Sequence, residues 1–318
     1  MSVAAPPAPR ERVWRPEGPL SVGATLSTLR RGGGDPTHRL LAERGVWRAT
    51  RTPDGPVLLR LVARPADGEV VATAWGPGAD WALAGVPELL GASDDATGFE
   101  PLPEHAALVA ARRAAPGWRV PRTRAVFEAL AASALEQRVT GKEAFAAWRT
   151  LVRRYGEPAP GPFGAVLGMY VPPPPAVWRQ IPSWAWLKVG VDGARSRVVL
   201  AAAQVAGRLE QTVGLSPEEV ERRLRTITGV GIWTAAEVRQ RAHGDPDAFS
   251  WQDYHVAKDV SWALTGRVLD DAGCAQVIDV YRGHRYRVQR LLELSGQARP
   301  RRAPRMTLPT HLPRPHPA

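Results

Sequence analysis

A glycine-containing bend and a carboxylate downstream of it are the residues of this sequence best suited to chemistry. The stretch TGVGIWTA (228–235) carries Gly229 and Gly231, and Asp253 follows Gly231 by 22 residues (253 − 231). An aspartate carboxylate can stabilise a developing positive charge and orient or deprotonate a water molecule. Aspartate is also a preferred helix N-cap, so both a catalytic and a capping role are open for Asp253.

The bend has its own binding chemistry. One helix is predicted to end near Ile227, and another to begin near Trp233 or Thr234. The two glycines permit positive φ and the close approach of an outside group. The first amides of the second helix have no acceptor within the helix, so they can bind an anion such as a DNA phosphate. An ordinary tight turn between helices is the alternative that the glycines alone leave open.

The composition favours a polyanionic partner. The 318 residues include 42 Lys and Arg against 31 Asp and Glu, a net charge of +11, and only three of the basic residues are lysines. A positive field of this size is typical of nucleic-acid binding, although arginine-rich composition from a GC-rich coding sequence would give the same balance. Cys274 is the only cysteine, which excludes an internal disulfide and a cysteine-rich zinc or iron–sulfur site. We expect a protein of the reducing cytosol, in bacteria the nucleoid, with no membrane span or secretory leader.

The predicted elements divide the chain into four regions. Residues 1–10 and the basic tail 299–318 are expected to be disordered. Residues 11–100 read as an α+β domain because short β-rich runs alternate with turn signals. Its expected strands are 46–52, 56–63 and 68–75, and its expected helices are 21–31 and 79–91.

Residues 104–298 read as helical. Thr140 and Glu143 form a capping box with Gly156 at the C′ position, and Ser216 precedes Pro217 as an N-cap. Further apolar stripes at helical spacing predict helices within 122–139, 194–210 and 253–264. The predicted fold class is therefore mostly α, with helical domains preceded by a small α+β domain.

The segment ITGVGIWTAAEVRQRAHGDPDAFSWQDYHVAK resembles the helix-hairpin-helix motif and the catalytic-aspartate loop of DNA glycosylases. Three further segments are similar, in the same order, to the 3-methyladenine DNA glycosylase II branch of that superfamily. They are 116–144, 187–203 and 281–292.

The resemblance implies a monofunctional enzyme that hydrolyses the N-glycosidic bond of alkylated bases in duplex DNA, initiating base excision repair. It assigns the catalytic role to Asp253, because a carboxylate near C1′ stabilises an oxocarbenium-like sugar. A lyase of this superfamily carries a lysine in the second hairpin helix, where this sequence has Trp233 and Thr234. The alternatives are a non-catalytic DNA-binding protein and a glycosylase for a different damaged base.

The resemblance also implies DNA contacts. The hairpin, through Gly229, Gly231, Trp233 and Thr234, would bind the backbone. Gln137 and Arg138 match the turn that enters the duplex when the base is flipped out, with Arg138 where the family has an apolar wedge. No cofactor is expected to be required, although a Na⁺ or K⁺ ion could be held by the carbonyls of Arg225, Ile227 and Val230. The expected partner is double-stranded DNA with a damaged base, bound by a monomer.

The base pocket is where the sequence departs from that branch. Trp233 matches a pocket tryptophan, but Glu237 and Glu293 replace aromatic residues. Aromatic rings stack on electron-poor methylated bases, so these changes leave the preferred lesion open. A carboxylate could instead pair with a cationic or amino-bearing base. Tyr254 is a candidate replacement ring, as are Trp251 and Trp262, which core packing would also explain.

Overall fold

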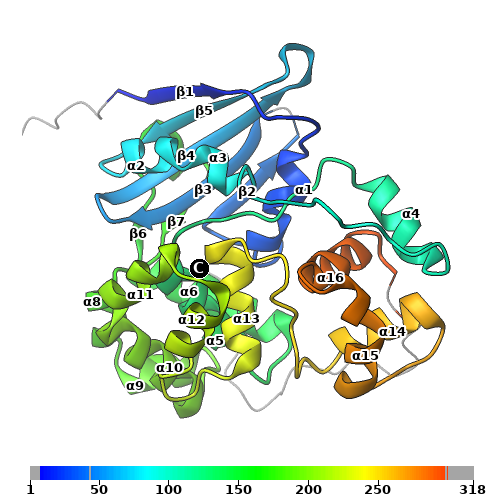
Figure 1. Cartoon of the computed structure of the whole chain (residues 1–318). Coiled ribbons are helices and arrows are strands. Elements are labelled where there is room, and N and C mark those ends of the chain that lie inside the picture. Colours follow the sequence, from blue (N-terminus) through cyan, green and yellow to red (C-terminus); the bar gives the residue numbers. More distant parts are fainter. Residues whose placement is uncertain (1–7, 43, 298, 300–318) are drawn as a thin grey trace, which may run out of the picture.

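The structure is a computed structural model that describes residues 8–42, 44–297 and 299. A five-stranded antiparallel sheet lies on one side of the molecule and helices lie on the other (Figure 1). The strand order is β1-β5-β4-β3-β2. The strands are β1 (Arg10–Trp14), β2 (His38–Leu41), β3 (Gly45–Thr52), β4 (Gly55–Arg64) and β5 (Glu69–Trp75).

Both faces of the sheet are buried, because each is covered by other elements. Alternate strand residues point to opposite faces. Leu59 and Leu61 pack on one face beneath α1 (Val22–Leu26), α2 (Ala79–Ala84) and α3 (Val86–Leu89). Leu58 and Trp75 point to the other face, where they meet Met169 and Val171. Val171 belongs to a small ladder of β6 (Glu157–Pro158) and β7 (Tyr170–Val171), and Met169 directly precedes β7. Part of the helical region therefore packs on the sheet.

The helices form two groups with separate cores, visible beneath the sheet in Figure 1. The first group contains α5 (Val126–Glu136), α6 (Gly141–Tyr155), α8 (Pro175–Gln180), α9 (Ser183–Lys188), α10 (Gly193–Gln204), α11 (Ala206–Glu210), α12 (Pro217–Leu224) and α13 (Ile232–Val238). The short helix α7 (Pro162–Val166) instead packs its Phe163 on Trp47 and Trp75 of the sheet. The second group contains α4 (Ala106–Ala114), α14 (Val256–Thr265), α15 (Asp271–Ile278) and α16 (Arg285–Leu294). The predicted mostly-α fold with a small N-terminal α+β part is confirmed.

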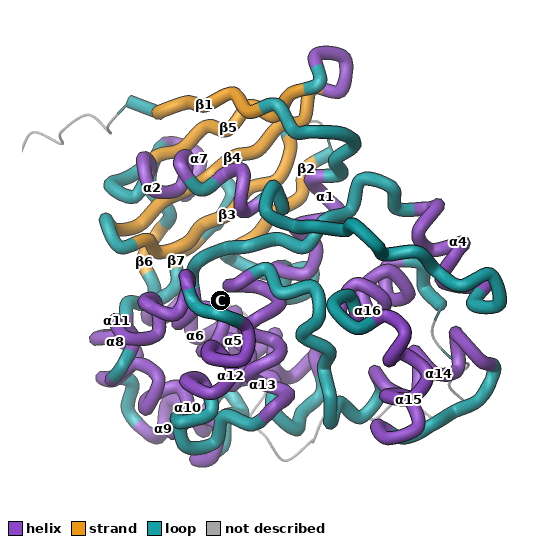
Figure 2. The backbone as a smooth tube through the Cα atoms, in the orientation of Figure 1, coloured by secondary structure: helices purple, strands orange, loops and turns teal. Residues whose placement is uncertain are grey.

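Two loops pass between the helical groups (Figure 2). One, residues 115–125, joins α4 to α5; the other, residues 244–255, joins the helical turn 239–243 after α13 to α14. The second loop carries Asp253. This connectivity brings a helix of the first group next to a loop that leads into the second.

The helix signals were correct at α6 and α12. Thr140 and Glu143 form a complete capping box, and the Ser216 side chain accepts from the Glu219 N–H. Gly156, however, is extended (φ −78°, ψ −171°) rather than left-handed. A Cβ there would lie 2.3 Å from the Val171 carbonyl oxygen, so the close approach of β7 requires the glycine.

The helix predicted over 194–210 is two helices. Val205 separates α10 from α11 with φ −114° and ψ 17°, and its N–H bonds to the Ala202 carbonyl three residues back. The periodicity continues across the break, which is why the sequence does not reveal it. The helices of the described residues are all too short or too polar to span a bilayer.

The predictions of disorder at the two ends of the chain concern residues that lie largely outside the described ranges. Residues 1–7 and 300–318 are not described, and β1 begins at Arg10. Arg299 donates to Asp259 at 2.9 Å. The expectation of disorder therefore stays a prediction for residues 1–7 and 300–318.

His243, at the end of the π-helical turn Arg239–His243 that follows α13, generates a prediction about pH. Burial lowers its pKa to about 4, and its Nε2 lies 2.9 Å from the Thr212 hydroxyl oxygen. The His243 imidazole stays neutral in the native state, whereas in the unfolded chain it binds a proton below about pH 6.5. The stabilisation is therefore complete above that pH and is lost as the pH falls toward 4.

We expect His243 to account for about 2 kcal/mol of the stability lost between pH 7 and pH 5. Urea unfolding of the wild type and of His243→Asn at both pH values measures this. The variant should lose less stability on acidification than the wild type. An equal loss in the two proteins would contradict the assignment.

Candidate active site

The turn between α12 and α13 has the geometry of a backbone clamp. Gly229 has φ +89°, and a Cβ there would lie 2.5 Å from Val198 Cγ2, so only glycine fits. Gly231 is extended (φ −90°, ψ −174°) and faces open space. Within the described residues, the amides of Gly229, Gly231 and Trp233 donate no hydrogen bond. These amides are available to an external acceptor.

Gln137 holds this turn against the end of α5. Its Nε2 donates to the Gly229 carbonyl at 3.0 Å and to the Thr234 hydroxyl at 2.8 Å. Thr234 is only 2% exposed. The Thr234 hydroxyl is therefore buried and paired within the protein. The predicted contact of Thr234 with DNA would have to come from its backbone, and it stays a prediction. The Gln137 amide nitrogen is likewise committed to the hairpin.

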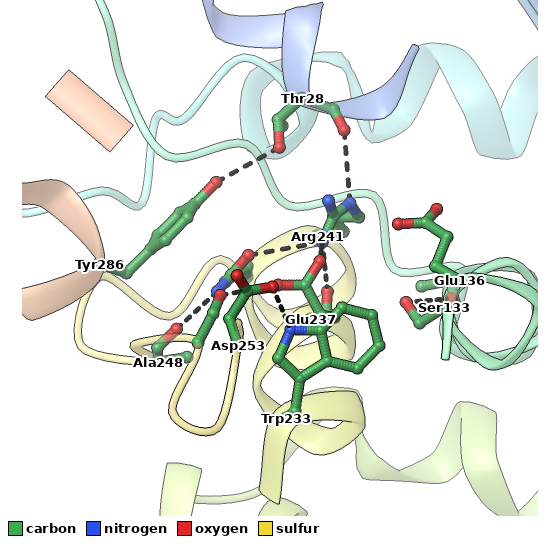
Figure 3. Close-up of polar contacts among 12 residues, drawn as sticks. Thr28, Ser133, Glu136, Trp233, Glu237, Arg241, Ala248, Asp253 and Tyr286 are labelled. Atoms are coloured by element: carbon green, nitrogen blue, oxygen red, sulfur yellow. Dashed lines mark hydrogen bonds and ion pairs between the residues drawn. The ribbon is translucent and has the colours of Figure 1, made fainter. Parts of the chain in front are cut away.

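Asp253 is held by three N–H donors. Its Oδ1 accepts from the His255 and Val256 amides at 2.8 and 3.1 Å, which caps the start of α14. Its Oδ2 accepts from the Trp233 indole Nε1 at 3.1 Å (Figure 3). The capping role is therefore present, and the second oxygen is directed toward the hairpin helix. The carboxylate and the hairpin are joined through one side chain.

Two residues with uncommon backbone conformations flank this region. Gln252, directly before Asp253, has φ +66°, and its N–H donates to Asp271 Oδ2 at 2.7 Å. Arg138, in the turn after α5, has φ +56° and an exposed side chain. A left-handed conformation at a residue other than glycine costs about 1 kcal/mol or more, and such residues gather at functional sites.

Glu237 is not the available carboxylate that pairing with a cationic or amino-bearing base would require. It is 6% exposed. Its Oε2 accepts from Arg241 Nη1 at 2.7 Å and its Oε1 from the Ser250 hydroxyl at 2.7 Å. Both oxygens are occupied and the charge is neutralised, so Glu237 is not free to pair with a cationic base.

A second carboxylate faces the same region from α5. In Figure 3, Glu136 points toward the Arg241 guanidinium. Its ion pair is to Arg31 Nε at 3.4 Å. Burial raises the pKa of Glu136, and the positive charges of Arg31 and Arg241 oppose that rise. Two arginines and two carboxylates, from three separated segments, thus surround one small region beside Trp233.

The other pocket candidates lie at the periphery. The Tyr254 ring is 74% exposed, with Lys258 Nζ 4.2 Å from its centroid. Glu293 bonds to Gln289 and Arg290, and Trp251 packs on Phe249 with centroids 4.3 Å apart. Stacking of Tyr254 or Trp251 on a bound base stays a prediction. Trp233, half-buried, is the aromatic residue next to the carboxylate.

The proposed cation ligands are backbone carbonyls on the hairpin. The Ile227 carbonyl accepts the Val230 N–H at 2.9 Å, which leaves one of its lone pairs. The carbonyls of Arg225 and Val230 accept no hydrogen bond from the described residues. Oxygen ligands of this kind fit Na⁺ or K⁺. The described residues contain no cluster of three His, Cys, Asp or Glu side chains that could hold a metal.

Three residues of the charged region beside Trp233 were not predicted from the sequence: Arg31, Glu136 and Arg241. Glu237 and Arg241 have the i, i+4 spacing of a helical ion pair, which could have identified them. No sequence signal connects Glu136 to Arg31 or to Arg241, because they come from different parts of the chain. Only the packing of α5 between the N-terminal segment and α13 brings them together.

Comparisons with known proteins agree with this architecture. A probable bifunctional transcriptional activator/DNA repair enzyme of Mycobacterium tuberculosis is 32% identical over 141 residues, 44% of this chain and 27% of the relative. The matched segment is thus about a quarter of that relative's length. No protein-family model matches the chain.

Solved structures share the fold over most of the chain. A 3-methyladenine DNA glycosylase from Archaeoglobus fulgidus has a TM-score of 0.70 at 16% identity, covering 90% of this chain and 98% of its own. An 8-oxoguanine glycosylase/lyase from Clostridium acetobutylicum has a TM-score of 0.64 at 12% identity, covering 91% and 98%. The resemblance to the helix-hairpin-helix glycosylase superfamily is confirmed in the fold.

The Gln137 bridge yields a prediction about stability. Gln137→Ala leaves the buried Thr234 hydroxyl without its donor and frees the Gly229 carbonyl, so we expect a loss of about 1–2 kcal/mol. Urea unfolding measures it. Gln204→Ala, an exposed glutamine on α10, is the matched control and should change stability by about 0.5 kcal/mol or less. Equal losses in the two variants would contradict the bridge.

Proposed function

We propose that this chain, which has the fold of the helix-hairpin-helix DNA glycosylases, is a monofunctional DNA glycosylase. It would hydrolyse the N-glycosidic bond of a damaged base in duplex DNA and so initiate base excision repair. The observation that carries the proposal is the Asp253 carboxylate, oriented by two backbone amides and by the indole of the hairpin residue Trp233.

The chemistry follows from the position of that carboxylate. Cleavage of the C1′–N bond leaves positive charge on the sugar, which a fixed carboxylate stabilises without having to reorganise. Asp253 also accepts a proton from, or orients, the water that attacks C1′. Its three N–H donors fix the direction of both oxygens, which favours one geometry for water and sugar.

DNA binding is proposed to rest on the hairpin. The amides of Gly229, Gly231 and Trp233 would donate to a phosphate, and a Na⁺ or K⁺ on the carbonyls of Arg225, Ile227 and Val230 would supply positive charge to that strand. Arg138, exposed in the turn after α5, would enter the duplex. The net charge of +11 supports a polyanionic partner.

The lesion is the finer part of the proposal. Resemblance to the 3-methyladenine branch favours an alkylated purine. A second candidate, a damaged base of another class, is favoured by the Glu237–Arg241 ion pair, because it occupies a position where an aromatic ring would stack on an electron-poor base. A non-catalytic DNA-binding protein is the remaining alternative.

The first test is release of the base. Duplexes that each carry one lesion are incubated with the wild type and with Asp253→Asn, and abasic sites are scored by alkaline cleavage. The variant should be slower by about a hundredfold or more, because an amide cannot stabilise the sugar cation as a carboxylate does. Asp279→Asn, at an exposed surface ion pair, is the matched control and should retain the wild-type rate.

DNA binding should be retained in Asp253→Asn. Binding without release from any lesion, in the wild type as well, would instead identify the chain as a non-catalytic DNA-binding protein.

The second test is covalent trapping. A lyase forms an imine between a lysine amine and C1′, which borohydride reduces to a stable adduct. The hairpin position is Trp233 here, and the nearby Lys258 amine lies over the Tyr254 ring. We therefore expect no borohydride-dependent protein–DNA adduct with a lesion that the protein releases. An adduct that disappears in Lys258→Arg would contradict monofunctional hydrolysis.

A further inference from the structure

We propose that Glu136 and Arg241 together read the far edge of the flipped base and select a purine that carries a lactam, a ring N–H beside a carbonyl. This inference rests on the proposed glycosylase function and names its substrate class. It is carried by a carboxylate and a guanidinium nitrogen that face one region from different elements.

Arg241 has an uncommitted donor. In the described part of the chain its four hydrogen bonds use Nε and Nη1, to the Thr28 carbonyl, the Glu237 carbonyl, Glu237 Oε2 and Gln240 Oε1. None uses Nη2. The guanidinium is thus anchored through Nε and Nη1, and the side chain as a whole is 14% exposed.

Glu136 is the matching acceptor. Its side chain is 19% exposed, and its ion pair to Arg31 Nε is long, at 3.4 Å. Glu237, by contrast, has both oxygens occupied at 2.7 Å. Of these two carboxylates, Glu136 is the one able to accept a hydrogen bond from a ligand.

The two groups lie where the far edge of a base would reach. Gln137, the next residue after Glu136, bonds to Thr234 in the first turn of α13. Side chains of a helix tilt toward its N-terminus, and the Arg241 guanidinium reaches back to Glu237, one turn after Trp233. With the sugar at Asp253, a purine beside Trp233 would therefore direct its Watson–Crick edge toward Glu136 and Arg241.

Hydrogen-bond polarity then sets the specificity. A lactam purine such as hypoxanthine presents a carbonyl oxygen to Arg241 Nη2 and a ring N–H to the Glu136 carboxylate. An adenine-type edge presents the reverse: an amino donor toward the guanidinium and a ring nitrogen acceptor toward the carboxylate. The site therefore favours lactams and disfavours adenine-type bases, including 3-methyladenine. Paired guanine is protected because extruding it from a stable pair costs more.

The test compares lesions within each variant. Release of hypoxanthine and of 3-methyladenine from otherwise identical duplexes is measured for the wild type, Glu136→Gln, Glu136→Ala and Glu128→Gln. Glu128 is the matched control, a carboxylate on the same helix that pairs with Arg48 and Thr50. We expect the wild type to prefer hypoxanthine and both Glu136 variants to reduce that preference by about tenfold or more, with Glu128→Gln unchanged.

If Glu136 had a purely structural role, its substitution would slow the release of both bases equally. An unchanged ratio of the two release rates in the Glu136 variants therefore overturns the inference. A wild type that releases 3-methyladenine faster than hypoxanthine also overturns it, while the proposed glycosylase function stands.

A binding measurement separates the inference from catalysis. Duplexes with 2′-fluoro-deoxyinosine or 2′-fluoro-deoxyadenosine at one position resist cleavage, and their affinities are measured by fluorescence anisotropy. A preference for inosine that Glu136→Gln abolishes supports the inference, even if the wild type releases no base and the proposed function fails. Equal preference in the wild type and Glu136→Gln overturns it.

Discussion

The hydrogen bond from the Trp233 indole to the Asp253 carboxylate is the interaction on which the site depends. Trp233 lies in the first turn of α13, and Asp253 lies on the loop that leads to α14. The two helical groups have separate cores. The distance between the hairpin turn and the Asp253 carboxylate is therefore set by the contact between the two groups. A change in that packing would move the carboxylate relative to anything bound at the hairpin.

Ser250 strengthens the same junction. Its hydroxyl donates to Glu237 and accepts from Gln240 and Gln289, and its backbone N–H donates to the Gln289 side chain. These partners lie on α13, on the π-helical turn after it and on α16. Buried polar groups are costly unless all are paired, so the network specifies one arrangement of the helices three residues before Asp253.

The N-terminal α+β part also contributes to the site. The Thr28 carbonyl accepts from Arg241, the Thr28 hydroxyl lies 3.3 Å from the Tyr286 hydroxyl, and Arg31 pairs with Glu136. The segment after α1 thus covers charges that α5 and α13 would otherwise expose. Its contribution is electrostatic and local, and it explains how two arginines and two carboxylates can be gathered at low exposure.

Local signals were enough for much of this protein. Several features depend on neighbours a few residues away, which the sequence contains: the capping box at Thr140, the cap at Ser216, the β-rich runs of β3 to β5 between turn signals, the glycine bend and Asp253. The break at Val205 and the extended Gly156 depend on contacts with the rest of the fold, and periodicity does not register them.

The site divides in the same way. The sequence by itself determined the hairpin and its downstream carboxylate, because their order and spacing are local properties of one segment. Only the tertiary structure decided that Gln137 and Thr234 pair with each other, that Ser250 occupies the second oxygen of Glu237, and that Glu136 faces Arg241. Those outcomes depend on which groups meet across 28–31, 133–137, 233–241 and 250, and the partner of a buried charge is fixed by packing rather than by composition.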